Sequence, residues 1–131
     1  MDRERVLLVE RGNKVGETFR QWPKEMRFIS PSFNQQGWTD SFDLNSIAYG
    51  TSPAYTVFSE HPTGQEYADY LFHVAEANEL NIRCNTEVTA IRPFADTKGF
   101  AIDVVSTSTG KSETIRCRFV VWAAGEFQYQ R

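Results

Sequence analysis

The chain has 131 residues, of which 40% are hydrophobic and 24% are charged, and these values are ordinary for a folded domain. Its net charge of −3 gives no reason to expect binding to nucleic acid or to an anionic membrane, and no apolar stretch approaches the roughly 20 residues that span a bilayer. Cys84 and Cys117 form no CxxC pair, so we interpret both as reduced strand residues of a cytoplasmic protein.

The first predicted element is a strand over residues 6–9. This continuous apolar run is typical of a parallel strand covered on both faces, and Gly12 ends it. Residues 13–62 follow with little helical periodicity, apart from a short strand predicted at 27–30. A loop this long inside a compact domain is expected to have a function. Its aromatic residues either anchor it by packing or form the wall of a ligand site: Trp22, Phe28, Phe33, Trp38, Phe42, Tyr49, Tyr55 and Phe58.

A capped helix is predicted after this loop. Thr63 and Glu66 stand at the spacing of a capping box, and Asn78 to Asn81 provide an exit. Between them an apolar face recurs at helical spacing, formed by Tyr67, Tyr70, Leu71, Val74 and Ala75. Because the helix stands between strands, it predicts a βαβ crossover and therefore a parallel sheet.

The remaining elements are strands. We predict one or two strands over residues 81–94, another over 100–105 and a third from Thr114, with turns between them at 96–99 and 106–111. Three strands joined by tight turns predict an antiparallel meander. Residues 119–123 then form a second continuous apolar run, which predicts another buried parallel strand that ends in small residues. The predicted fold class is therefore α/β.

Two features of the sequence point to a ligand. Glu10 ends the first strand, where an acid accepts hydrogen bonds from a ribose in dinucleotide-binding sheets, although a solvated acid at a strand end is the alternative. The run Ala123-Ala124-Gly125 lets backbone approach a bulky ligand, although a tight turn explains it as well.

Other candidate groups carry less information. Arg20, Lys24 and Arg27 stand near Trp22 and could hold a phosphate or a planar ring, but a solvent-facing loop packed by its own aromatics explains them better. The two histidines, at positions 61 and 73, have no second ligand at metal spacing, so no metal site is predicted. No GxSxG, P-loop or HExxH motif is present, and the catalytic residues stay unknown.

The order of these elements resembles a known family across the whole chain, residues 1–131. The segments VLLVERGNKVGETFRQWPKEMRFISPSFN, GTSPAYTVFSEHPTGQEYADYL and VVWAAGEFQY look closest to the NAD(P)/FAD-dependent oxidoreductases. These are flavoproteins with two dinucleotide-binding domains, and they include bacillithiol-disulfide-reductase-like and flavin-monooxygenase-like enzymes. The resemblance implies a Rossmann-like FAD-binding domain that includes the aromatic-rich loop at about 13–62.

The resemblance also assigns roles to residues. Glu10 would hold the FAD ribose, Arg11 would lie beside the adenosine, and the backbone of Val88 would contact the adenine. Gly16 matches the first glycine of a double-glycine loop whose second position is Glu17 here. Three further groups complete the implied cofactor site: Ala123, Ala124 and Gly125 near the pyrophosphate, and Trp22 with residues 28–33 toward the isoalloxazine.

The family's first strand, GxGxxG loop and helix are missing from this sequence. The resemblance therefore implies a partial domain: a fragment, an alternative start or a truncated reading frame. The missing strand would lie between residues 6–9 and 119–123, and without it backbone edges stay unpaired. We expect this chain alone to bind FAD weakly or not at all, and to be inactive.

The implied activity is that of an oxidoreductase in which hydride passes from NAD(P)H to FAD and on to a small disulfide or to oxygen. The absence of CxxC gives no support to a dithiol relay, so disulfide reduction without one and flavin monooxygenation stay open. A non-enzymatic alternative is a small binding module that uses the aromatic loop. The partner would be a small-molecule substrate, and the choice between NADH and NADPH and homo-oligomerisation stay open.

Overall fold

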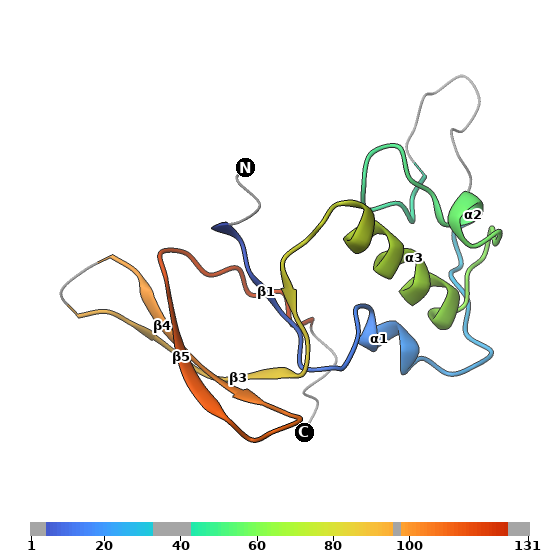
Figure 1. Cartoon of the computed structure of the whole chain (residues 1–131). Helices are drawn as coiled ribbons and strands as arrows, with labels where there is room; N and C mark the ends of the chain where they lie inside the picture. The colour runs from blue at the N-terminus through green and yellow to red at the C-terminus, as the bar shows by residue number, and fades with distance from the viewer. Residues whose placement is uncertain (1–4, 33–42, 96–97, 126–131) are drawn as a thin grey trace. The chain divides into compact units, whose positions relative to one another are not determined.

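The structure is a computed structural model that describes residues 5–32, 43–95 and 98–125. It divides into two compact units, residues 1–85 and residues 86–131 (Figure 1), and each unit is described by itself. The first unit contains the helices and a pair of short parallel strands, and the second contains an antiparallel sheet.

The first unit is a βαβ arrangement. Its elements are β1 (Leu8–Val9), α1 (Glu17–Arg20), α2 (Pro53–Thr56), α3 (Gly64–Ala77) and β2 (Ile82–Arg83). The strands β1 and β2 are parallel, with Leu8 opposite Ile82 and Val9 opposite Arg83. Because α3 precedes β2 in the sequence, the predicted helical crossover between parallel strands is confirmed.

Helix α3 begins at the predicted capping box. The Thr63 hydroxyl accepts a hydrogen bond from the Glu66 amide at 3.2 Å, and the Glu66 carboxylate accepts one from the Thr63 amide at 2.7 Å. The bond from the Thr63 amide lowers the pKa of Glu66. The helix ends at Ala77 with Asn78 as its C-cap, so the predicted exit is confirmed.

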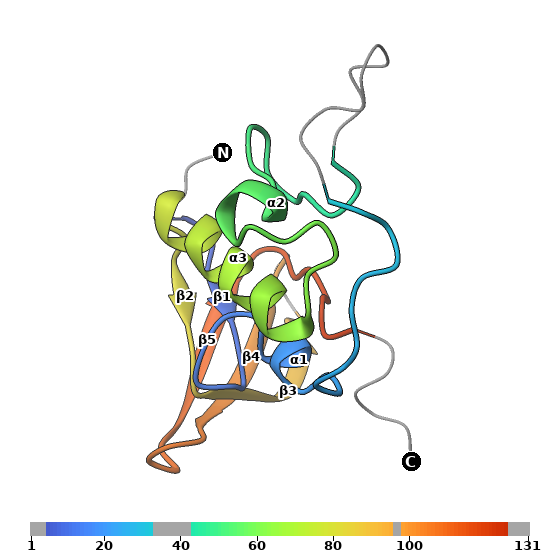
Figure 2. The same ribbon diagram turned by 90° about the vertical axis from the view of Figure 1, so that its right-hand side faces the viewer.

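The buried face of α3 forms the core of the first unit. Both α1 and α2 contact this helix (Figure 2). Rings from the long segment 13–62 pack against Tyr67, with centroid distances of 4.3 Å to Phe28 and 4.7 Å to Phe19. Trp22 joins them at 5.1 Å from both Phe19 and Phe28. For these residues the anchoring role predicted for the aromatic loop is confirmed, while Phe33, Trp38 and Phe42 lie outside the described residues.

The long segment also contains structure that its pattern did not predict. Helices α1 and α2 have four residues each, which is too short for an apolar periodicity to repeat. Ser52 caps α2 by accepting from the Ala54 amide at 3.2 Å, and Pro53 occupies the first turn. The strand predicted at 27–30 is wrong, because this stretch makes only an isolated bridge between Arg27 and Thr63.

A buried carboxylate ties distant parts of the segment together. Asp43 accepts hydrogen bonds from the Ser32 hydroxyl at 2.5 Å, from the Asn45 amide at 2.8 Å and from the Ser52 hydroxyl. The carbonyl of Asn45 in turn accepts a bond from the Tyr67 hydroxyl at 2.8 Å. These bonds satisfy polar groups that burial would otherwise leave costly, and they link the loop to α3.

The second unit is the predicted meander. Strands β3 (Thr86–Pro93), β4 (Phe100–Ser106) and β5 (Ser112–Cys117) pair antiparallel in that order. Residues 81–94 thus hold two strands, β2 and β3. On one face of the sheet Val104 is buried, and on the other Asp103 accepts a bond from Thr114 at 2.8 Å and pairs with Arg92. The partnership with Arg92 lowers the pKa of Asp103.

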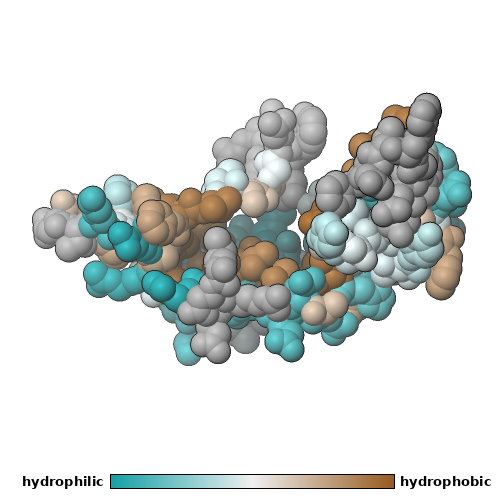
Figure 3. Space-filling model, turned by 90° about the horizontal axis from the view of Figure 1, so that it is seen from above, coloured by the Kyte–Doolittle hydropathy of each residue, from teal (hydrophilic) through white to brown (hydrophobic). Residues whose placement is uncertain are grey.

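The two continuous apolar runs are not buried strands. Only Leu8 and Val9 of the first run are in a strand, and Val6, Leu7 and Leu8 are about 40% exposed. Residues 119–123 make no strand, and Phe119, Val121 and Trp122 are 66–87% exposed. Figure 3 shows hydrophobic residues at the surface. The prediction fails because such a run needs strands on both sides, and within the described residues β1 pairs only with β2.

The hydroxyl group of Tyr70 gives a first test of this architecture. It is fully buried and accepts a bond from the Ile47 amide at 3.0 Å, and it shares a hydrogen bond of 2.7 Å with Thr51. Replacing Tyr70 by Phe is expected to lower the free energy of unfolding by about 1–2 kcal/mol, because the Ile47 amide and the Thr51 hydroxyl both lose their bond to the buried tyrosine. The control Y55F alters an exposed ring and should change it by less than about 0.5 kcal/mol. Equal effects in urea denaturation would contradict this assignment.

Tyr67 predicts a dependence of stability on alkaline pH. Burial raises the pKa of Tyr67 to about 12, so the folded state holds the phenol proton more tightly than the unfolded chain does. The stabilisation that the protonated Tyr67 phenol gives the folded state is fully present below about pH 10, the ordinary pKa of tyrosine. It is lost as the pH rises toward 12. Between pH 10 and pH 12 the free energy of unfolding of the wild type, measured by urea denaturation, should fall by up to about 2–3 kcal/mol more than that of Y67F. If the free energy of unfolding fell equally with pH in the two proteins, this role of Tyr67 would be contradicted.

Candidate functional site

The candidate site lies where the chain leaves β1. Glu10 follows Val9, and its amide donates to the Arg83 carbonyl at 3.0 Å, which extends the pairing with β2 by one residue. Its side-chain oxygen Oε1 accepts a hydrogen bond from the Gly12 amide at 2.6 Å. The acid predicted to receive a ribose is therefore held at the carboxyl end of a parallel strand, where nucleotides bind in open α/β sheets.

The end of β2 completes this turn. Asn85 adopts a left-handed backbone with φ of +52°, and its amide donates to the Gly12 carbonyl at 2.7 Å. Cys84 beside it has a raised pKa, chiefly because of its burial and secondly because of the Glu10 charge. Cys84 lies just past β2 rather than in a strand, whereas Cys117 ends β5 as predicted; within the described residues neither forms a disulfide.

The Glu10 carboxylate keeps an acceptor for a ligand. In the described part of the chain its Oε1 bonds to Gly12 and no hydrogen bond reaches its Oε2. A carboxylate accepts only, so Oε2 suits a hydroxyl donor such as a ribose. The residues present thus fit the ribose of FAD, and Arg11 is exposed beside Glu10.

Gly16 lies close to α3. It precedes α1 with φ of +81°, and an added Cβ would stand 2.8 Å from the Cα and 2.9 Å from the Cβ of Ala68. Both the backbone conformation and the close approach of the helix therefore explain this glycine. Glu17, at the second position of the family's double glycine, directs its side chain toward Gly12. The role of Gly16 toward a flavin stays a prediction.

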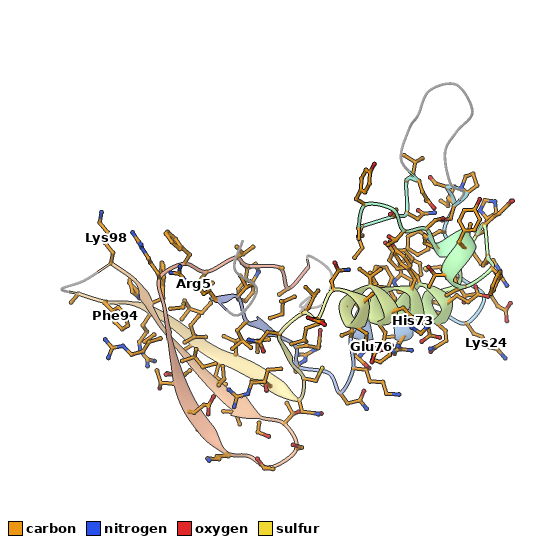
Figure 4. All side chains as sticks on the ribbon, turned by 45° about the horizontal axis from the view of Figure 1, so that its top comes forward. Arg5, Lys24, His73, Glu76, Phe94 and Lys98 are labelled. Atoms are coloured by element: carbon orange, nitrogen blue, oxygen red, sulfur yellow. The ribbon has the colours of Figure 1, made fainter. Side chains whose placement is uncertain are left out.

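Two of the three cations near Trp22 form ion pairs within the first unit. Arg20 pairs with Asp69 of α3 at 2.9 Å, and Arg27 lies 3.7 Å from Glu66 and donates to the His61 carbonyl at 3.0 Å. Lys24 is exposed (Figure 4). With Trp22 packed on other rings, the explanation by a loop packed on its own aromatics accounts for this stretch, and a role of Trp22 toward the isoalloxazine stays a prediction.

The other predicted cofactor residues lie in the second unit. Val88 is half-buried in β3, opposite Val104 and at a bulge of the ladder between Val88 and Ala90. Ala123 and Gly125 are exposed and Ala124 is half-buried, in a stretch without strand pairing where Gly125 has φ of +76°. The structure brings Glu10, Arg11, Gly16 and Trp22 into one unit and these residues into the other.

The histidines lie outside the site. The Nδ1 atom of His61 is 3.0 Å from the Phe28 carbonyl, and His73 lies with Glu76 on the exposed face of α3 (Figure 4). Over residues 5–32, 43–95 and 98–125 no three His, Cys, Asp or Glu side chains come together as metal ligands would. In the same residues no helix has the length and apolarity needed to cross a bilayer.

Gly12 and Asn85 belong to the site although the sequence did not identify them. The sequence pattern indicates Gly12 only as the end of a strand, and Asn85 only as part of a strand region. The signal that could have found Gly12 is its position two residues after the acid, where a backbone amide reaches back to a carboxylate.

The fold and this site define an α/β protein with a partial Rossmann-like architecture. The family model of the pyridine nucleotide-disulphide oxidoreductases matches residues 1–131, and the chain belongs to that family.

Two solved structures share the fold. One is the bacillithiol disulfide reductase Bdr (YpdA) from Bacillus cereus, with 14% identity and a TM-score of 0.62 over 88% of this chain. The other is DfoA bound to FAD, the cadaverine monooxygenase of desferrioxamine biosynthesis from Erwinia amylovora, with 15% identity and a TM-score of 0.53 over 86% of this chain. The matched region spans 30% of the first protein's chain and 28% of the second.

The close contact of Gly16 with α3 can be tested against a matched glycine. Gly50 has a similar φ of +73°, but nothing lies within 4 Å of a Cβ added there. We expect G50A to cost about 1 kcal/mol of unfolding free energy through backbone strain, and G16A to cost about 1–3 kcal/mol more because it must displace α3. Thermal and urea unfolding of both variants measure the difference. Equal costs would show that the approach of α3 does not require a glycine at position 16.

Proposed function

We propose that this chain is part of the FAD-binding domain of an NAD(P)H-dependent oxidoreductase. The observation that carries the proposal is the Glu10 carboxylate, held by Gly12 at the end of β1, with no hydrogen bond to its Oε2 among the described residues. Membership of the pyridine nucleotide-disulphide oxidoreductase family supports it. When bound, FAD would supply hydride chemistry, and the role of Glu10 is to bind and orient its ribose.

The electron acceptor is proposed to be a small disulfide or oxygen. One structure that shares the fold is a disulfide reductase and the other a monooxygenase, and both likenesses are compatible with the absence of CxxC from this sequence. In a longer protein that contains this chain, NAD(P)H oxidation that requires a low-molecular-weight disulfide would favour the reductase. Peroxide formation, or an oxygen requirement with substrate, would favour the monooxygenase.

A second candidate function is a binding module without catalysis. A specific observation favours it: the second half of the long segment exposes apolar side chains, and Phe58 is 91% exposed with φ of +54°. An exposed aromatic in a left-handed conformation is uncommon and marks a strained position. The apolar residues exposed in this region are Leu44, Ile47, Tyr49, Tyr55 and Phe58.

Binding of FAD tests the first proposal. We expect the purified chain to carry no stoichiometric flavin absorbance, and titration with FAD to shift the backbone amide NMR signals of residues 10–12 in a weak, saturable way. Replacing Glu10 by Gln removes one charge that a ribose hydroxyl would approach, and is expected to weaken binding about tenfold. The matched control E25Q alters an exposed acid of α1's neighbouring loop and should leave the affinity unchanged.

The outcomes separate the proposals. Signals that shift only at residues 44–58, or shifts that E10Q leaves unchanged, would contradict a ribose site at Glu10, and the former would favour the binding module. Stoichiometric flavin in the purified chain would contradict the expectation of weak binding and leave the FAD site supported.

A further inference from the structure

We propose that Gly12 is a positioning residue for the Glu10 carboxylate. Its amide holds Oε1, and its lack of a side chain keeps open the space that Oε1 and the Glu17 side chain occupy. The inference rests on the proposed function, because Glu10 matters to a ligand only if its second oxygen receives a hydroxyl. It adds to that function a residue that fixes which oxygen is presented.

Space, rather than backbone freedom, explains why this residue is a glycine. Among the described residues with positive φ, which include Gly16 and Gly50, Gly12 is not found, so its backbone conformation is open to any amino acid. A Cβ at position 12 would stand 2.6 Å from Cγ and 2.8 Å from Cβ of Glu17, and 3.1 Å from Oε1 of Glu10. The first two distances are overlaps, and the third is tight enough to displace the carboxylate by a few tenths of an ångström.

The turn cannot relieve these contacts by moving away. Its far end is fixed because the Gly12 carbonyl accepts from the Asn85 amide at 2.7 Å, and its near end because the Glu10 amide donates to the Arg83 carbonyl at 3.0 Å. Arg83 is the last residue of β2, and Asn85 lies two residues further along the chain. A side chain at position 12 must therefore displace Glu17, Glu10 or both.

The bond from Gly12 decides which oxygen of the Glu10 carboxylate faces a ligand. With Oε1 occupied by the Gly12 amide, the carboxylate is fixed in one orientation and Oε2 remains for an incoming hydroxyl. A group held before the ligand arrives loses less conformational entropy on binding than a mobile one. Loss of the Gly12 bond should therefore weaken binding even when the carboxylate itself is kept.

The structure allows the two contacts of Gly12 to be separated. Replacing Glu17 by Gly removes both overlapping atoms, so in the E17G background Oε1 of Glu10 is the one that remains of the three atoms nearest to an alanine Cβ at position 12. The test compares E17G with G12A/E17G in the full chain. Thermal unfolding of both variants should agree within a few degrees, which excludes loss of the fold as the cause of any other difference.

The decisive measurement needs no ligand. An amide that donates to a carboxylate resonates downfield, so replacing Glu10 by Gln should move the amide proton of Gly12 upfield in the E17G background. In the G12A/E17G background, the same replacement is expected to move the amide proton of residue 12 by less than half as much. An undiminished response in G12A/E17G would overturn the proposal, because the carboxylate would then keep its position beside a methyl group.

Titration with FAD tests whether Gly12 affects the binding of a ligand. G12A is expected to raise the dissociation constant at least about threefold in the E17G background. The control G110A strains a glycine with φ of +72° that has open space around it in the second unit, and should leave the constant unchanged. Equal affinities of E17G and G12A/E17G would overturn the positioning role. If the wild-type chain shows no FAD response at all, as the missing first strand allows, the amide measurement alone decides the role of Gly12.

Discussion

The contact between two tyrosines of α3 and the long aperiodic segment is the interaction on which the first unit depends. The ring of Tyr67 packs against Phe19 and Phe28, while its hydroxyl donates to the Asn45 carbonyl. Tyr70 is fully buried and bonds to Ile47 and Thr51. Ordering the described parts of this segment, residues 13–32 and 43–62, costs about 1–2 kcal/mol per residue in backbone entropy. A few large rings with hydrogen-bonding ends offset that cost at several points.

The sequence pattern predicted α3 and the meander, because residues close together in the chain determine both. The capping box at Thr63 and Glu66 fixes the start of α3, and the apolar spacing of Tyr67, Tyr70 and Val74 fixes its buried face. Turn residues and alternation likewise gave the meander. Residues 119–123 show the limit of this reasoning, because an apolar run becomes a strand only beside another strand, and the run itself does not say whether one is there. The helices α1 and α2 were not predicted, because an apolar spacing cannot repeat within four residues.

The candidate site was predictable in kind but not in detail. An acid at the end of an apolar strand pointed to Glu10, and the structure places it beside β2 as a parallel sheet requires. Glycines were harder to interpret, because a sequence shows that a side chain is absent but not what occupies its space. The resemblance predicts Gly16 in a flavin loop, and the structure shows Ala68 of α3 lying against it. Gly12 was interpreted as a strand end, yet it bonds to Glu10.

These two glycines connect the site to the core. The turn from Glu10 to α1 is held at Gly12 by the Glu17 side chain and at Gly16 by Ala68, and Ala68 neighbours Tyr67 on the buried face of α3. The position of the acid therefore depends on the packing of the helix, even though α3 makes no hydrogen bond to Glu10 in the described structure. In this unit the orientation of the candidate binding group is coupled to the core, because the turn that bears Glu10 packs against α3 at Gly16.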